Sequence, residues 1–355
     1  MVAPLKLNVR LPCVRVCSVE PLRGLVKPRK VIMLKRFLSY YKPQMGLFVA
    51  DTVCALVLAA IDLAFPMILR NLTGGLFTQG QAAIMRALGM IAVGLVLMYA
   101  VRCACRYFVS YWGHVMGARM ESKMREDLFD QYERFSFAYF DRNSSGDMMS
   151  RVVNDLFDIC EAAHHVPEWI IICGIEIIGS FVILFTIAPV LALAMAVVTA
   201  AFAVIMFWQN MRMREVFSDN RKKISGINAQ LQDSLAGMRV VKSFANEETE
   251  RAKFRASNDR YLSSKENMYH AMGVYTATYG LLSGVLYVIV VLLGGWLVAQ
   301  GQLQAVDMAT FALYISLFCT PLETLVNSAE TYQKAIAGFK RMDEVLSTAP
   351  DIQVL

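Results

Sequence analysis

Residues 169–208 read WIIICGIEIIGSFVILFTIAPVLALAMAVVTAAFAVIMFW, and the only charged side chain among these 40 residues is Glu176. A helix needs about 20 apolar residues to cross the hydrocarbon core of a bilayer. The stretch therefore predicts two membrane-spanning helices. The turn between them is expected at Ala188-Pro189, because proline disfavours helical backbone at the residue before it. Trp169 and Trp208 then lie at the same membrane face, as aromatic belt residues do.

The composition of the whole chain also indicates a membrane protein. Of its 355 residues, 56% are hydrophobic and 18% are charged, against about 25% charged in an average soluble domain. Residues 272–306 carry no charge at all. The apolar stretches together predict six spans, at about residues 45–70, 84–106, 167–187, 190–210, 272–299 and 308–330. The expected fold class is an all-α membrane protein with six long transmembrane helices that have cytosolic extensions.

The basic residues indicate the orientation of the spans, because Lys and Arg concentrate in cytosolic segments. Of the 35 Lys and Arg residues, 33 lie in four segments: the tail to Lys42, residues 102–151, residues 212–265 and residues 334–341. Arg70 and Arg86 are the two that lie near the opposite face. We therefore expect an integral, multi-pass protein of a bacterial plasma membrane, with both termini in the cytosol.

Residues 1–34 form a basic tail that lacks the apolar core of a secretory signal. Three interpretations of this tail stay open. The first is a cytosolic segment that binds anionic lipid headgroups. The second is an unstructured segment. The third is that translation starts at Met33, so that most of the tail is not translated.

The cysteines and histidines do not predict a metal site or a disulfide framework. Only two cysteine pairs lie close together in the sequence, Cys13 with Cys17 and Cys103 with Cys105. No second pair has zinc-site spacing. His164 and His165 are adjacent, so on a helix they point about 100° apart, which disfavours a shared ion.

The connection between the fourth and fifth predicted spans is unusually long. It covers residues 209–270 and has the apolar periodicity of a helix. Two antiparallel helices of about 30 residues would each extend about 45 Å. We expect this hairpin to dock on a partner, and the alternative is a solvated hairpin with a charged face.

Three segments, in order and between the expected spans, resemble the membrane domains of ATP-binding-cassette (ABC) exporters of the six-span type. The first segment, residues 140–155, begins FDRNSSGDMMSR and is similar to the first coupling segment of that family. The second, residues 233–254, begins DSLAGMRVVKSF and is similar to the second coupling segment, although the family more often has Glu at the position of Asp233. The third, residues 321–346, contains YQKAIA and resembles the end of the sixth span.

The resemblance implies that residues 35–346 are an ABC exporter transmembrane domain, which forms a domain-swapped dimer and has coupling segments at about 140–147 and 241–250. The expected coupling residues are Phe140, Gly146, Asp147, Ser150, Arg151, Asp155, Gly237, Val241, Lys242, Phe244 and Glu247.

The residues themselves add local expectations for both coupling segments. Gly146 permits a tight reversal, and Ser144 with Asp147 has the spacing of a capping box. The helix that follows the fourth span is expected to end near Phe244, beside an apolar cluster that suits a groove on a partner.

In this family a nucleotide-binding domain normally follows the sixth span, and residues 347–355 are expected to begin the linker to it. The 355 residues contain no G-x-x-x-x-G-K-[ST] loop, which cradles phosphates in such domains. We therefore expect no catalytic, cofactor or metal site in this chain, and ATP and Mg²⁺ are expected to bind through a nucleotide-binding domain. The expected partners are the lipid bilayer, a second half-transporter in a homodimer or heterodimer, and that domain. Nucleic acid is not expected.

Two acidic residues inside the predicted spans, Asp62 and Glu176, are candidate cavity residues. An ionised group within a bilayer costs a few kcal/mol unless it faces water or a partner. The alternative is a structural role at the cavity edge or, for Asp62, a hydrogen bond near the kink at Pro66. Asp51 is expected at the cytosolic interface.

The leading hypothesis for the function is active export by a permease subunit with alternating access. The second is a truncated or split-gene product that acts as a non-transporting membrane scaffold or partner. An ion-driven secondary transporter is disfavoured, because the sequence lacks the paired broken helices typical of that class.

Overall fold

The computed structural model describes residues 29–349, with side chains from Met33 onward. It divides into two units, Met1–Ser39 and Tyr40–Leu355. In the first unit the described residues are helical from Arg29, where α1 (Arg29–Tyr41) begins. Most of the predicted basic tail, including Cys13 and Cys17, and residues 350–355 of the predicted linker lie outside the described residues.

In the part of the second unit that the structure describes, all regular elements are helices, and six helical stretches are long and apolar enough to cross a membrane. The prediction of an all-α fold with six long helices is thereby confirmed, whereas the limits of the membrane within each stretch stay predictions. The stretches are built from α2 (Met45–Gly74), α3 (Gln81–Phe108) with α4 (His114–Glu133), α6 (Ser145–Ser150) with α7 (Leu156–Ile187), α8 (Pro189–Ala236), α10 (Glu247–Ala299) and α11 (Ala305–Ser347).

Short elements connect the long helices. Two π-helical turns, Val109–Gly113 and Arg151–Asp155, join α3 to α4 and α6 to α7 without interrupting the helical path. Two short helices, α5 (Phe137–Arg142) and α9 (Met238–Ser243), lie between long ones. Single 3₁₀ turns cover Lys42–Gln44 and Leu76–Thr78.

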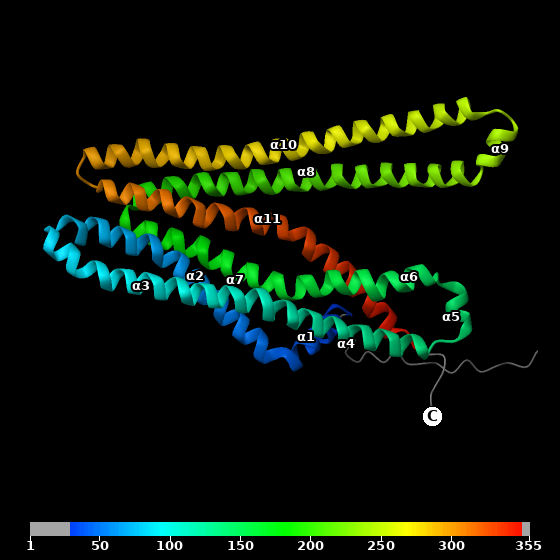
Figure 1. Cartoon of the computed structure of the whole chain (residues 1–355), viewed down its shortest axis with the longest axis horizontal. Coiled ribbons are helices and arrows are strands. Elements are labelled where there is room, and N and C mark those ends of the chain that lie inside the picture. Colours follow the sequence, from blue (N-terminus) through cyan, green and yellow to red (C-terminus); the bar gives the residue numbers. More distant parts are fainter. Residues whose placement is uncertain (1–28, 350–355) are drawn as a thin grey trace, which may run out of the picture. The chain divides into compact units, whose positions relative to one another are not determined.

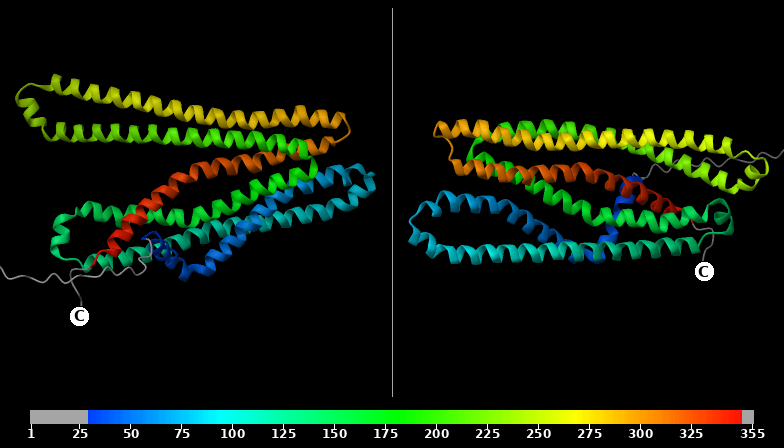
Figure 2. Two further views of the ribbon diagram at one scale, coloured as in Figure 1. Left: turned by 180° about the vertical axis from the view of Figure 1, so that it is seen from behind. Right: turned by 45° about the horizontal axis from the view of Figure 1, so that its top comes forward.

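The connections gather at two opposite ends of the long helices. The connections from α2 to α3, from α7 to α8 and from α10 to α11 lie at one end, and α5, α6 and α9 lie at the other (Figures 1 and 2). Figure 1 also shows α8 and α10 side by side as a hairpin with α9 at its tip. The turn at Ala188 lies where the sequence predicts it, because α7 ends at Ile187 and α8 begins at Pro189.

The core of the second unit lies where α7, α8, α10 and α11 meet, since α11 packs along α7 and α8 packs along α10. The fully buried side chains there include Phe311, Tyr314, Phe318, Leu184, Leu191 and Leu286. By contrast, the most apolar stretch of α3 has no buried residue. Such a surface fits contact with lipid, because lipid tails are as apolar as the side chains themselves.

The end of α8 differs from the prediction. This helix ends at Ala236 and not near Phe244, because the backbone of Gly237 leaves the helical conformation. Glycine is among the poorest helix formers, which favours a break at this position. The separate helix α9 then carries the apolar residues of the second coupling segment.

The predicted capping box at Ser144 and Asp147 is also wrong. Ser144 does precede the first residue of α6, but its side chain makes no capping hydrogen bond. A capping box forms instead at the start of α11, where Gln304 and Asp307 bond each other's backbone amides. That second box ties the loop at residues 300–304 to the first turn of α11.

Candidate functional site

A charged cavity of about 410 Å³ lies among α2, α3, α7 and α11 in the predicted membrane region. Both acids singled out from the sequence, Asp62 and Glu176, line it. Arg106 of α3 and Glu168 of α7 add further charge, and hydroxyl groups come from α11 at Ser316, Thr320 and Thr324. The structure thus brings the two candidate acids to one cavity, and their contact with a substrate stays a prediction.

Asp62 has a partner that sequence reasoning did not find. Arg102 of α3 donates from Nε to Asp62 Oδ1 at 2.8 Å and from Nη2 to Oδ2 at 3.3 Å. Both side chains are partly exposed, on α2 and α3 respectively. A two-bond contact of this kind lowers the cost of holding a carboxylate within a membrane. Asp62 is therefore held by an ion pair between α2 and α3, one helical turn before Pro66.

The opposite end of the helices has a comparable contact. Arg70, near the end of α2, donates from Nε to Oδ1 of Asp307 at 2.5 Å. Asp307 is buried and also caps α11 through Gln304. One carboxylate thus fixes the beginning of α11 and joins it to α2. This role of Arg70 is not predictable from the sequence, because Asp307 lies 237 residues away in the chain.

The first candidate coupling segment contains α5, α6 and the π-helical turn that leads into α7. Phe140 is exposed on α5, while Gly146, Asp147 and Ser150 are exposed on α6. Arg151 is half-buried at the start of the turn. The expected coupling residues of this segment therefore divide into an exposed group and a group that packs inward.

Asp155 belongs to the inward group and is 7% exposed. Arg341 of α11 donates to both of its carboxylate oxygens, each at 2.6 Å. Gly338 permits this approach, because a Cβ atom there would lie 3.2 Å from the Asp155 carbonyl oxygen. The ion pair joins the first coupling segment to the last turns of α11. Arg341 was recognised in the sequence as part of the third matching segment, but its partner was not.

The second candidate coupling segment lies at the tip of the α8–α10 hairpin. Phe244 is 79% exposed, and Val240, Lys242 and Glu247 are exposed as well, while Val241 is half-buried. The hydroxyl of Ser234 donates to Glu250 Oε1 at 2.5 Å and so joins α8 to α10 beside the tip. This hydrogen bond and the nearby Lys253 lower the pKa of Glu250. The tip is thus an ordered turn that presents apolar side chains to the outside.

The comparison with known families matches residues 48–322 to the ABC transporter transmembrane region. The chain belongs to this family. It is accordingly an integral, multi-pass membrane protein with six candidate spans. The match covers both candidate coupling segments and the cavity residues except Thr324.

Similar proteins are ABC transporters from bacteria. An uncharacterized ABC transporter ATP-binding protein, YwjA of Bacillus subtilis (strain 168), is 32% identical over 90% of this chain and 55% of its own length. An ATP-dependent lipid A-core flippase of Syntrophus aciditrophicus (strain SB) is 23% identical over 91% of this chain and 53% of its own length. A putative multidrug export ATP-binding/permease protein, YgaD of Bacillus subtilis (strain 168), is 23% identical over 88% of this chain and 55% of its own length. The chain spans about half the length of these curated relatives.

Proposed function

We propose that this chain is the permease subunit of an ATP-driven exporter and that it forms the substrate pathway in a dimer of half-transporters. Family membership supports this proposal, as do relatives whose names include export and lipid flipping. ATP and Mg²⁺ bind through nucleotide-binding domains, which this proposal assigns to the ends of α5–α6 and α9. The charged cavity then takes an amphipathic substrate with a polar or charged group.

The exposed apolar tip of the hairpin is the observation that carries the proposal. Phe244 and Val240 are exposed on a segment that follows a 48-residue helix. At about 1.5 Å per residue, that helix is about 72 Å long, more than twice the hydrocarbon core. The tip therefore lies outside the lipid, where exposed apolar groups are typical of a protein interface. A groove on a nucleotide-binding domain is the partner that the family resemblance implies.

Motion reaches the cavity through two paths in this proposal. A shift of α9 moves the paired helices α8 and α10, which pack together along their length and both contact α11. A shift of α5 and α6 moves α7 directly and moves α11 through the Asp155–Arg341 ion pair. Helices α7 and α11 both line the cavity. Nucleotide-driven movement at the tips can thus change the side of the membrane to which the cavity opens.

The test is transport by the chain assembled with its nucleotide-binding domains in liposomes, with fluorescent lipids and amphipathic dyes as candidate substrates. We expect ATP-dependent transport that ADP does not support. Phe244→Ala is expected to weaken coupling by about 2–4 kcal/mol if this side chain is a buried anchor. Phe129→Ala is the matched control, since Phe129 is exposed on α4 outside both coupling segments.

Two results would contradict the proposal. One is full ATP-dependent transport by the Phe244→Ala complex. The other is a stable complex that binds ATP but moves none of the substrates in either direction, which would favour a membrane scaffold instead.

A further inference from the structure

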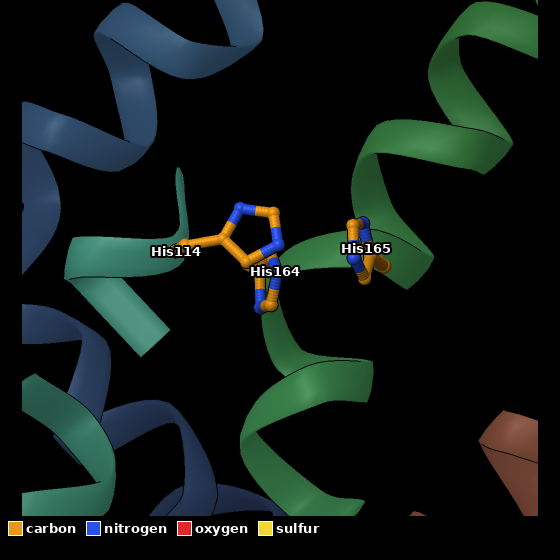
Figure 3. A group of neighbouring side chains, drawn as sticks. All are labelled: His114, His164 and His165. Carbon is orange, nitrogen blue, oxygen red and sulfur yellow. The ribbon is translucent and has the colours of Figure 1, made fainter. Parts of the chain in front are cut away.

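Three of the four histidines in the chain meet at one place in the fold. His114 is the first residue of α4, directly after the π-helical turn Val109–Gly113, and His164 and His165 lie on α7. The ligand nitrogens of these three side chains all lie within 4.8 Å of one another (Figure 3). The ring centroids of His114 and His164 are 4.6 Å apart, and those of His164 and His165 are 4.0 Å apart. The spacing of His164 and His165 in the sequence disfavours a shared ion for the pair alone, and the third ring comes from another helix.

The ring of His164 has one nitrogen, Nε2, that is available to bind a metal ion. Its Nδ1 lies 2.8 Å from the carbonyl oxygen of Cys160. A carbonyl oxygen only accepts hydrogen bonds, so Nδ1 carries the proton and Nε2 keeps its lone pair. His164 is 4% exposed, and its buried Nε2 has no hydrogen-bond partner among the described residues. Metal-binding histidines commonly have this arrangement, in which the second ring nitrogen bonds a backbone carbonyl.

A buried carboxylate lies beside the histidines. Asp51 of α2 is 5% exposed, and its Oδ1 has no hydrogen-bond partner within the part of the chain that the structure describes. A Cβ atom on Gly113 would lie 3.3 Å from Asp51 Oδ1 and 3.9 Å from the His164 ring. The carboxylate and the ring therefore approach the same point. Buried charge is unfavourable unless it is paired or contacts a metal ion, so a cation would relieve this site.

The surrounding residues hold the cluster in place. A Cβ atom on Gly117 would lie 3.0 Å from His164 Nδ1, so the lack of a side chain there allows the ring to lie against α4. His165 has a carboxylate oxygen 3.6 Å from each ring nitrogen, from Glu161 and from Glu168. Its ring stacks on Trp169 at 4.9 Å between centroids. The contacts with α4 and Trp169 thus keep the three rings next to one another, and several acids nearby can balance the charge of a divalent ion.

We propose that His114, His164 and His165 bind one divalent late transition-metal ion, with Asp51 as the nearby balancing acid. Neutral imidazole nitrogens suit Zn²⁺, Ni²⁺, Cu²⁺ and Co²⁺ more than Mg²⁺ or Ca²⁺. Tetrahedral binding at about 2.0–2.1 Å places ligand nitrogens about 3.3 Å apart. The ligand atoms of the three histidines lie within 4.8 Å of one another, so the rings have to move closer together when the ion binds. The ion joins α4 to α7, two helices that flank the first coupling segment. Glu168 and Trp169, which contact His165, also line the charged cavity.

The experiment measures Zn²⁺ and Co²⁺ binding to the full chain in detergent, purified through a tag that contains no histidine. Equilibrium dialysis against Zn²⁺ gives the stoichiometry and affinity. The visible spectrum of bound Co²⁺ distinguishes histidine and carboxylate ligands from the thiolates of the free cysteines. The variants are His114→Gln, His164→Gln and His165→Gln. His270→Gln is the matched control, because His270 lies on α10 and outside the cluster.

We expect one Zn²⁺ per chain, a Co²⁺ spectrum without thiolate ligands, and apparent affinity at least tenfold weaker in each cluster variant but unchanged in His270→Gln. Thermal unfolding without metal checks that each variant folds. His114 is exposed, so its variant keeps the test valid if the buried His164→Gln does not fold. Absence of saturable binding, a thiolate spectrum, or equal affinity in His114→Gln and His270→Gln would each overturn the proposal.

Discussion

At the scale of single residues, long-range ion pairs are what the structure adds to the sequence. Asp62 was recognisable as an acid within an apolar span, and Arg341 as part of a family-like segment. Their partners, Arg102 and Asp155, lie 40 and 186 residues away in the chain. Hydropathy and spacing do not give the rotation of one helix relative to another, so these pairs could not be predicted. The histidine cluster was missed for the same reason, since it depends on how α4 faces α7.

The Asp155–Arg341 pair gives a prediction about stability. Arg341→Ala leaves the carboxylate of Asp155 buried without its guanidinium partner, and we expect a loss of about 1–3 kcal/mol in the free energy of unfolding. Arg341→Lys is expected to restore only part of it, because an ammonium lacks the planar pair of nitrogen donors that matches the two carboxylate oxygens. The measurement is thermal unfolding of the purified chain in detergent.

Arg221→Ala is the control for that prediction. Arg221 pairs with Glu330 at 3.2 Å, and both side chains are largely exposed. Exposed pairs contribute about 0–1 kcal/mol, so this variant should lose less stability than Arg341→Ala. Equal losses in the free energy of unfolding of the two variants would show that the Asp155–Arg341 pair stabilises the protein no more than an exposed pair does.

At the scale of elements, the sequence predicted the long helices well and their ends less well. Apolar runs and proline at residue 189 were sufficient to place the turn at Ala188. The end of α8 was misplaced because the helical pattern continues across Gly237 into α9, and periodicity alone does not show the break. The two π-helical turns had no recognisable signal, since each inserts about one residue into an otherwise continuous helix.

The packing of α4 on α7 gives the second prediction. Gly117→Ala places a methyl group 3.0 Å from His164 Nδ1, and we expect a loss of about 1–3 kcal/mol as the two helices shift apart. Gly89→Ala on α3 is the matched control, because a Cβ atom there meets nothing within 4 Å. It should be neutral or stabilising by up to about 1 kcal/mol, since alanine favours helix over glycine. Thermal unfolding measures the stability of both variants. An unchanged stability in Gly117→Ala would contradict the close contact between Gly117 and the His164 ring.

At the scale of the whole molecule, the arrangement of connections leads to a prediction about topology. The loops at residues 75–80 and 300–304 lie at the end opposite α5, α6 and α9 (Figure 1). Because 33 of the 35 basic residues lie in the segments assigned to the cytosol, the loop end should face the exterior. In a cysteine-free background, Thr78→Cys and Gln302→Cys should react with an impermeant thiol reagent in intact cells. Ser243→Cys should react only after the cells are opened, and labelling of Ser243→Cys in intact cells would reverse the topology.

The last prediction concerns the dimer. The tip helix α9 contacts the two helices that flank it, α8 and α10, and Phe244, directly after α9, stays exposed within one chain. In the proposed exporter, a domain-swapped dimer covers this tip, because the hairpin reaches the nucleotide-binding domain beneath the opposite half. A crosslinker from Ser243→Cys should therefore join the tip to the domain associated with the other chain. The experiment uses two differently tagged copies of the chain, each assembled with its own tagged nucleotide-binding domain. The mass and the tags of the crosslinked product then show whether the tip is joined to the domain of its own half-transporter or to that of the other half. Phe129→Cys on α4 is the control, since it is exposed but lies outside the hairpin and should not give that product. Crosslinks from Ser243→Cys only to the domain of the same half-transporter would show that the hairpin is not exchanged.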